Sequence, residues 1–174
     1  ARQFNPQVTV VPTSVDTERF QVVARNSTCE RIVVGWTGSS TSQTYLEAFA
    51  PMLRELLARY PIELRVHSDR EPNLPGVPCI WRRWSAETEV EEIRQFDIGL
   101  MPMPDEEWAK GKCAMKALLY MSLGIPAVCS AVGANCEVIQ HGENGMLAYT
   151  TEEWLNSLGT LIEDAALRAR LGQA

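Results

Sequence analysis

The sequence has no long hydrophobic run, and this absence limits the class of protein it can be. No apolar stretch approaches the roughly 20 residues that span a bilayer, and the N-terminus has no basic segment followed by a short apolar core. Neither a transmembrane helix nor a signal peptide is therefore predicted. We expect the 174 residues to form one cytoplasmic domain, with room for peripheral membrane association of the full-length protein.

Histidine is scarce and the cysteines are unevenly spaced, which argues against a metal centre. Only His67 and His141 are present, and no two of the five cysteines have Cys-x-x-Cys spacing. The odd number of cysteines and their apolar surroundings favour reduced thiols. We assign no metal ion and no cofactor.

Excess positive charge and a dinucleotide-binding motif are also missing. With 16 Lys and Arg against 22 Asp and Glu, the net charge of -6 argues against a general nucleic-acid-binding surface. Residues 35–40 read Gly-Trp-Thr-Gly-Ser-Ser, which lacks the Gly-x-Gly-x-x-Gly expected of a dinucleotide-dependent oxidoreductase. Any anion site must therefore be local.

What the sequence does have is an alternation of strands and helices. Short apolar runs predict strands at 8–11, 31–36, 62–67, 79–81, 96–101, 126–130 and 146–148. Helices are predicted at 45–60, 85–95, 112–123 and 135–140, with two more capped by Thr150 and Asp164. Pro51 must kink the first helix or begin its second half. This order predicts an α/β fold with a doubly wound parallel sheet, Rossmann-like, in which residues 29–174 form the domain and residues 1–28 a linker with the first short strand.

The stretch from Gly111 to Lys116 is the most informative local feature. It follows a strand and a proline-rich loop and leads into a helix that we expect to begin near Lys112. The first N–H groups of a helix have no internal partner and favour an anion, and Lys112 and Lys116 would share one helix face. Cys113 would gain reactivity there, although a small filler residue is the simpler interpretation. The alternative for the two lysines is ordinary solvation.

Three segments should meet where ligands bind in such sheets, beyond the carboxyl ends of the strands. They are residues 36–42, 82–85 and 101–116. Together they suggest a nucleotide with its diphosphate on the helix start and its base near Trp84, which could equally be a core anchor. Arg82 and Arg83 are interpreted as surface charges, and the glutamates at 87, 89, 91 and 92 as a solvated helix face.

Several motifs resemble the donor-binding domain of the family 4 retaining glycosyltransferases, which have the two-domain GT-B fold. Residues 11–20 resemble the interdomain segment P-N-G-V-D-x-x-x-F, with Thr13 and Ser14 in place of Asn-Gly. Residues 97–102 resemble A-D-V-x-x-x-P, and residues 124–147 resemble G-x-P-V-V, G-G-x-x-E-x-I and G-x-N-G-x-L in order. The loop G-W-x-G-S and the segment W-x-x-G-K-C-x-x-K-x-x-x-Y-M, starting at Trp108, are typical of a subgroup.

The resemblance implies metal-independent transfer of a sugar from a nucleotide diphosphate sugar with retention of configuration. Lys112 and Lys116 would then stabilise the departing diphosphate as the catalytic residues. The donor-binding residues would be Gly35, Trp36, Gly38, Ser39, Ser40, Trp84, Gly111, Cys113, Ala114, Met115 and Tyr120. An N-terminal acceptor domain of the same protein would complete the active site, so this fragment alone should be inactive.

Two departures from the family pattern leave an alternative open. Gly111 and Leu119 stand where the family has glutamates associated with the donor sugar and the ribose. The basic residues after the family's first strand are replaced by Ser39, Ser40, Thr41 and Thr44. A noncatalytic GT-B module for nucleotide binding or assembly is therefore the second hypothesis, and a GT-B sugar epimerase is a third.

Overall fold

A computed structural model describes residues 3–23 and 31–174. Its centre is a six-stranded sheet in the order β3-β2-β1-β4-β5-β6, with every neighbouring pair parallel. The strands are β1 Val33–Gly38, β2 Glu63–Ser68, β3 Ile80–Arg83, β4 Ile98–Met101, β5 Ala127–Ser130 and β6 Met146–Ala148. Strands β4 and β5 are buried throughout, as expected of strands covered on both faces.

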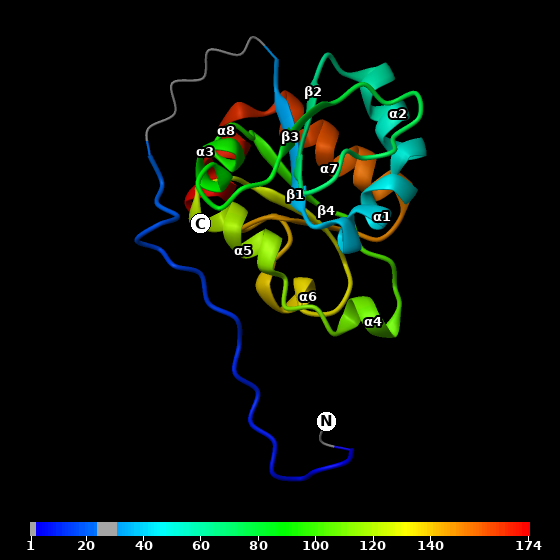
Figure 1. Ribbon diagram of the computed structural model, residues 1–174. Helices are drawn as coiled ribbons and strands as arrows, with labels where there is room; N and C mark the ends of the chain where they lie inside the picture. Colours follow the sequence, from blue (N-terminus) through cyan, green and yellow to red (C-terminus); the bar gives the residue numbers. More distant parts are fainter. Residues whose placement is uncertain (1–2, 24–30) are drawn as a thin grey trace.

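Helices cover both faces of the sheet (Figure 1). They are α1 Ser40–Ala48, α2 Ala50–Arg59, α3 Glu89–Ile93, α4 Glu107–Lys110, α5 Met115–Ser122, α6 Asn135–Val138, α7 Thr151–Glu163 and α8 Ala165–Gln173. Adjacent residues of β1 belong to different cores: Val34 to the one with α2 and α7, Val33 to the one with α5. The doubly wound α/β fold predicted from the sequence is confirmed.

The strand order reverses at β1, and this reversal positions the site. Strand β1 pairs with β2 on one side and with β4 on the other, so the chain winds away from β1 in both directions. The loops that leave the carboxyl ends of β1 and β4 diverge to opposite faces of the sheet. A crevice forms between them, which is where open α/β sheets bind ligands.

The N-terminal segment differs from its prediction. No strand forms within residues 3–23, so the predicted strand at 8–11 was wrong. Val10 and Val11 are exposed and find no sheet edge to join, and Pro12 cannot donate to a ladder. Phe20 is nevertheless buried in the core that contains α5, which attaches the segment to the domain. Residues 24–28 of the predicted linker lie outside the described residues.

The bounds of several helices also differ from those predicted from the sequence. The helix predicted at 45–60 is two helices separated at Phe49, with Pro51 in the first turn of α2, as expected. Helix α1 already begins at Ser40, inside the predicted loop. Ser85 accepts the Thr88 N–H in a turn before α3 instead of capping the helix directly. Asn135 is the first residue of α6 and not its cap, whereas the caps at Thr150 and Asp164 are confirmed.

None of the helices within residues 3–23 and 31–174 is both long enough and apolar enough to cross a membrane.

Candidate functional site

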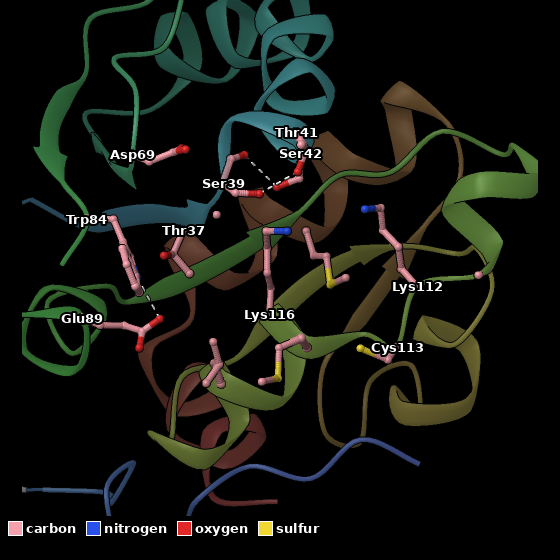
Figure 2. A pocket seen from close by; sticks show the side chains of 15 residues that line it. Thr37, Ser39, Thr41, Ser42, Asp69, Trp84, Glu89, Lys112, Cys113 and Lys116 are labelled. Carbon is pink, nitrogen blue, oxygen red and sulfur yellow. Dashed lines mark hydrogen bonds between the residues drawn. The ribbon is translucent and has the colours of Figure 1, made fainter. Parts of the chain in front are cut away.

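A cavity of about 550 Å³ opens at the crevice beside β1 and β4 (Figure 2). All three segments expected to converge contribute to it, together with residues from the end of β2 and from α3. Its walls are Thr37, Gly38, Ser39, Thr41, Ser42, Asp69, Trp84, Glu89, Met101, Gly111, Lys112, Cys113, Met115, Lys116 and Leu119. A volume of this size is typical of small-molecule sites.

Two lysines supply the positive charge of the cavity. The Lys116 ammonium lies 5.4 Å from the centre of the Trp36 ring, and the Lys112 ammonium lies 5.6 Å from the centre of the Tyr45 ring. Burial, followed by the nearby charge of Lys112, lowers the pKa of Lys116 to about 8. The chain has three lysines in all, and only Lys110, paired with Asp105 at 2.7 Å, lies outside the cavity.

The helix start beside these lysines differs from its prediction. Helix α5 begins at Met115, because Ala114 has a φ of 55° and turns the chain in the left-handed region. Lys112 is therefore in the preceding loop, and the two lysines do not share a helix face. Among the described residues, no acceptor takes the N–H groups of Cys113, Ala114 or Met115. The N–H groups of Cys113 and Met115, whose residues line the cavity, remain able to bind an anion.

Small hydroxyl residues line the wall opposite α5. The Ser39 and Thr41 hydroxyls are 2.7 Å apart, and the Ser42 hydroxyl donates to the Ser39 carbonyl over 3.1 Å. A Cβ on Gly38 would lie 2.7 Å from Cε of Lys116. Glycine at position 38 therefore lets the Lys116 side chain lie against the end of β1.

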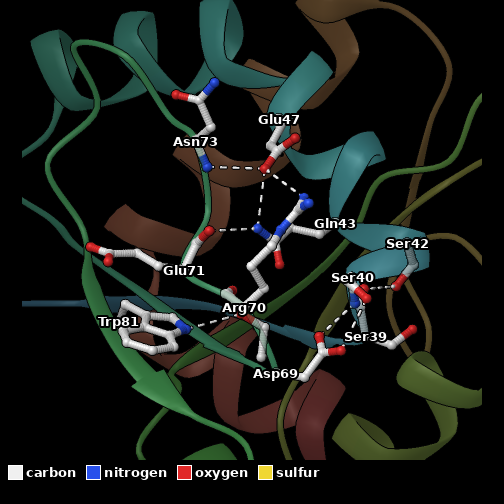
Figure 3. A network of polar contacts seen from close by, with 11 residues as sticks. Ser39, Ser40, Ser42, Gln43, Glu47, Asp69, Arg70, Glu71, Asn73 and Trp81 are labelled. Atoms are coloured by element: carbon white, nitrogen blue, oxygen red, sulfur yellow. Dashed lines mark hydrogen bonds and ion pairs between the residues drawn. The ribbon is translucent and has the colours of Figure 1, made fainter.

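A polar network holds the Asp69 side of this wall in place (Figure 3). Asp69 accepts hydrogen bonds from the backbone nitrogen and the hydroxyl of Ser40, at 2.6 and 3.0 Å. Farther along the loop, Glu47 accepts from Gln43 and from the Asn73 N–H at 3.1 and 2.9 Å. The loop after β2 is thereby attached to α1, and Ser40 fixes Asp69 instead of lining the cavity.

The far end of the cavity is aromatic and acidic. Trp84 is 42% exposed, so it is a cavity wall and not a core anchor. Its Nε1–H donates to one carboxylate oxygen of Glu89 over 3.1 Å, and Arg19 donates to the other over 3.1 Å. Figure 2 shows Trp84 and Glu89 on one side, Lys112 and Cys113 on the other, and Lys116 between them.

Five predicted donor-binding residues do not line the cavity. Gly35 packs under Phe96, where an added Cβ would lie 2.0 Å from the ring. Trp36, Ala114 and Tyr120 are buried, and Ser40 binds Asp69. Burial raises the pKa of the Tyr120 hydroxyl, which therefore stays protonated and serves as a hydrogen-bond donor. These residues support the wall from behind.

Sequence patterns did not predict two of the acidic wall residues, Asp69 and Glu89. Asp69 directly follows β2, a position that the rule for carboxyl ends of strands could have identified. Glu89 was assigned to a solvated face, and this was wrong, because its side chain is only 15% exposed. The Glu89 side chain is held at the cavity by a hydrogen bond from Arg19, 70 residues away in the sequence. No local sequence pattern predicts this contact. Arg82 and Arg83 are exposed, as expected.

In residues 3–23 and 31–174, no three His, Cys, Asp or Glu side chains gather closely enough to hold a metal ion. Cys79, Cys113, Cys129 and Cys136 are free thiols, and Cys29 lies outside the described residues.

The chain matches a known protein family. The family model for glycosyl transferases group 1 matches residues 31–164, which include the whole sheet and the cavity. The chain belongs to the group 1 glycosyl transferases. This match confirms the resemblance of its motifs to that family. None of the curated proteins matches the chain significantly.

Several solved structures share the fold of this group 1 glycosyl transferase chain. The C-terminal domain of LpcC, a group 1 protein from Francisella tularensis, has a TM-score of 0.72 at 19% identity, covering 92% of this chain and 93% of that domain. HepE from Anabaena, solved with UDP-glucose, has a TM-score of 0.61 at 18% identity over 82% of this chain and 42% of HepE. TarM from S. aureus has a TM-score of 0.66 at 11% identity over 87% of this chain and 33% of TarM. The chain therefore spans less than half of HepE or TarM.

The two unusual positions of this group 1 glycosyl transferase both lie in the cavity wall. Gly111 and Leu119 line it, and neither carries a carboxylate. The carboxylates that do line it in the described chain, those of Asp69 and Glu89, come from other elements.

Proposed function

We propose that this chain is the donor-binding domain of a glycosyltransferase that takes a sugar from a nucleotide diphosphate sugar and transfers it to an acceptor with retention of configuration. The observation that carries the proposal is the order of groups in the cavity, with Trp84 at one end and Lys116 and Lys112 toward the other. A nucleotide diphosphate has the matching order of flat base, ribose and anionic diphosphate. The complex of HepE with UDP-glucose supports the same class of ligand.

Lys112 and Lys116 would act on the leaving group. When the bond between the sugar and the diphosphate breaks, negative charge grows on the departing phosphate oxygens. Cations and N–H groups already aimed at that position stabilise the charge without reorganising. Lys112, Lys116 and the N–H groups of Cys113 and Met115 occupy that position in the proposal, and the reaction then needs no metal ion.

The remaining parts of the proposal concern the whole protein. An acceptor domain N-terminal to this chain would close over the cavity and supply the acceptor site, so the chain alone should transfer no sugar. We expect hexose as the transferred group. Product analysis by NMR, with the complete protein and a defined acceptor, would report retention directly.

Titration calorimetry tests the binding step with UDP, UDP-glucose, GDP and GDP-mannose. We expect one site, and at least a tenfold loss of affinity in Lys112→Ala and in Lys116→Met, because each removes a charge-assisted contact worth about 1.5–3 kcal/mol. Lys110→Ala is the matched control, since Lys110 pairs with Asp105 outside the cavity. No binding of any of these ligands at millimolar concentration would contradict the proposal.

The carboxylate-free walls at Gly111 and Leu119 favour a second candidate, a noncatalytic nucleotide-binding or assembly module. It shares the binding step but predicts that the complete protein consumes no nucleotide sugar. Release of UDP or GDP by the complete protein, tested with each donor, therefore distinguishes the two functions.

A further inference from the structure

We infer that Glu89 is the group that recognises the ribose hydroxyls of the nucleotide, and that Arg19 positions it. The inference rests on the proposed function, since it assumes that a nucleotide occupies the cavity. It assigns to α3 a contact that the apolar side chain of Leu119 cannot make.

Glu89 lies beside the exposed ring of Trp84. Its carboxylate is 3.1 Å from Nε1 of Trp84, on the same side of the cavity. If a base stacks on the exposed ring of Trp84, the ribose is attached to that base by a single bond. The ribose hydroxyls must then fall near the edge of the tryptophan, and Glu89 is the carboxylate at that edge.

The negative charge of Glu89 suits a neutral part of the nucleotide. A carboxylate repels the diphosphate, so it suits the part of the ligand that carries neutral hydroxyl donors. Carboxylates bind ribose hydroxyls in other α/β nucleotide sites for this reason. Lys116 and Lys112 lie away from Glu89 in Figure 2, which separates the anion-binding end from the hydroxyl-binding end.

The Glu89 carboxylate has room for further hydrogen bonds. One of its oxygens accepts from Trp84 and the other from Arg19, which leaves a further lone pair on each. Glu89 can therefore accept from a ligand without losing its partners.

Arg19 fixes the carboxylate in this position. It donates to the Ala86 carbonyl over 2.5 Å and to Glu89 over 3.1 Å, and it belongs to a turn in which Asp16 accepts the Glu18 and Arg19 N–H groups. The segment before the domain is thus joined to the cavity wall. Arg19 acts through Glu89, because it is not itself among the wall residues.

Calorimetry with matched nucleotides tests the inference. The probes are UDP, 2′-deoxy-UDP and 2′,3′-dideoxy-UDP, and the corresponding GDP series. We expect the wild-type chain to lose at least tenfold in affinity when the hydroxyls are removed. Glu89→Gln should bind UDP at least tenfold more weakly and should discriminate much less between UDP and its dideoxy form. Glu87→Gln, a change in the same segment but outside the cavity wall, should behave as wild type.

Arg19 is tested by the same discrimination ratio. Arg19→Ala should reduce the ratio, and Arg19→Lys should restore part of it, which a purely structural role would not predict. Equal binding of UDP and dideoxy-UDP by the wild-type chain would overturn the inference while leaving the proposed function intact. Full discrimination retained in Glu89→Gln would also overturn it, and failure of every nucleotide to bind would overturn both.

Discussion

The Tyr120 hydroxyl accepts a hydrogen bond from the Thr37 backbone N–H over 3.1 Å, across 83 residues of sequence. The same hydroxyl donates to the Leu100 carbonyl, also over 3.1 Å. One side chain of α5 therefore ties the end of β1 to β4 at the place where the strand order reverses. The tie lies directly behind the cavity wall, because Thr37 and Met101, the residue after Leu100, both line the cavity.

Tyr120→Phe should lower the free energy of unfolding by about 1–3 kcal/mol. The change removes both hydrogen bonds and leaves a buried N–H and a buried carbonyl without that partner. Urea denaturation followed by circular dichroism measures the effect. Tyr149→Phe is the control, since Tyr149 is 65% exposed. A stability change no larger in Tyr120→Phe than in this control would contradict the role of the tie.

The sequence was sufficient to predict the sheet because its strands carry a strong local signal. Residues such as Ile98 and Leu100 belong to a short apolar run that ends at Pro102, and alternation of such runs with helices selects the parallel arrangement. The strand at 8–11 shows the limit of that signal. Its valines have the right pattern, but pairing depends on a free sheet edge, which is a property of the whole fold.

The candidate site was predictable in location and less so in detail. The rule for carboxyl ends of strands correctly brought residues 36–42, 82–85 and 101–116 together. It did not distinguish wall residues from those behind the wall. Gly35 and Gly38 are three apart on β1, yet only Gly38 lines the cavity, because Gly35 is covered by Phe96. Such packing depends on contacts distant in sequence.

Gly38→Ala should weaken nucleotide binding. The new Cβ would lie 2.7 Å from Cε of Lys116 and 2.7 Å from Cη2 of the buried Trp36, so both side chains must shift and Lys116 loses its position in the cavity. We expect about a tenfold loss of UDP affinity. Gly142→Ala is the matched control, since Gly142 lies outside the cavity wall and its Cβ would meet nothing within 4 Å. Equal affinity in the two variants would show that Lys116 does not contact the ligand.

His67 should make stability fall as the pH decreases from about 7 to 5. Burial lowers the pKa of His67 below its usual 6.5, and the carboxylates of Glu92 and Glu89 only partly oppose this shift. The unfolded chain therefore takes up the proton first, and stability is lost as the pH falls below 6.5. His67→Gln removes this titration. Its unfolding free energy, measured by urea denaturation at several pH values, should depend less steeply on pH than that of the wild type, and parallel curves would contradict the prediction.

Nucleotide binding should take up a proton at alkaline pH. The pKa of Lys116 is about 8 in the free protein, so at pH 8.5 most of these side chains are neutral. A bound diphosphate favours the charged ammonium and raises the pKa again, while its own phosphates are already fully ionised. Binding at pH 8.5 should therefore take up a measurable fraction of a proton, and UDP affinity should fall as the pH rises from 8 to 10. Calorimetry in two buffers of different ionisation enthalpy measures the uptake.

The Lys116→Arg variant separates this effect from other titrations. A guanidinium stays charged throughout that pH range, so the variant should bind UDP without proton uptake and with an affinity that is nearly flat from pH 8 to 10. Lys110→Arg should keep the wild-type pH dependence, because Lys110 lies outside the cavity. If Lys116→Arg still took up a proton on binding, the titrating group would have to be another residue, and Lys116 would not be the cation that meets the diphosphate.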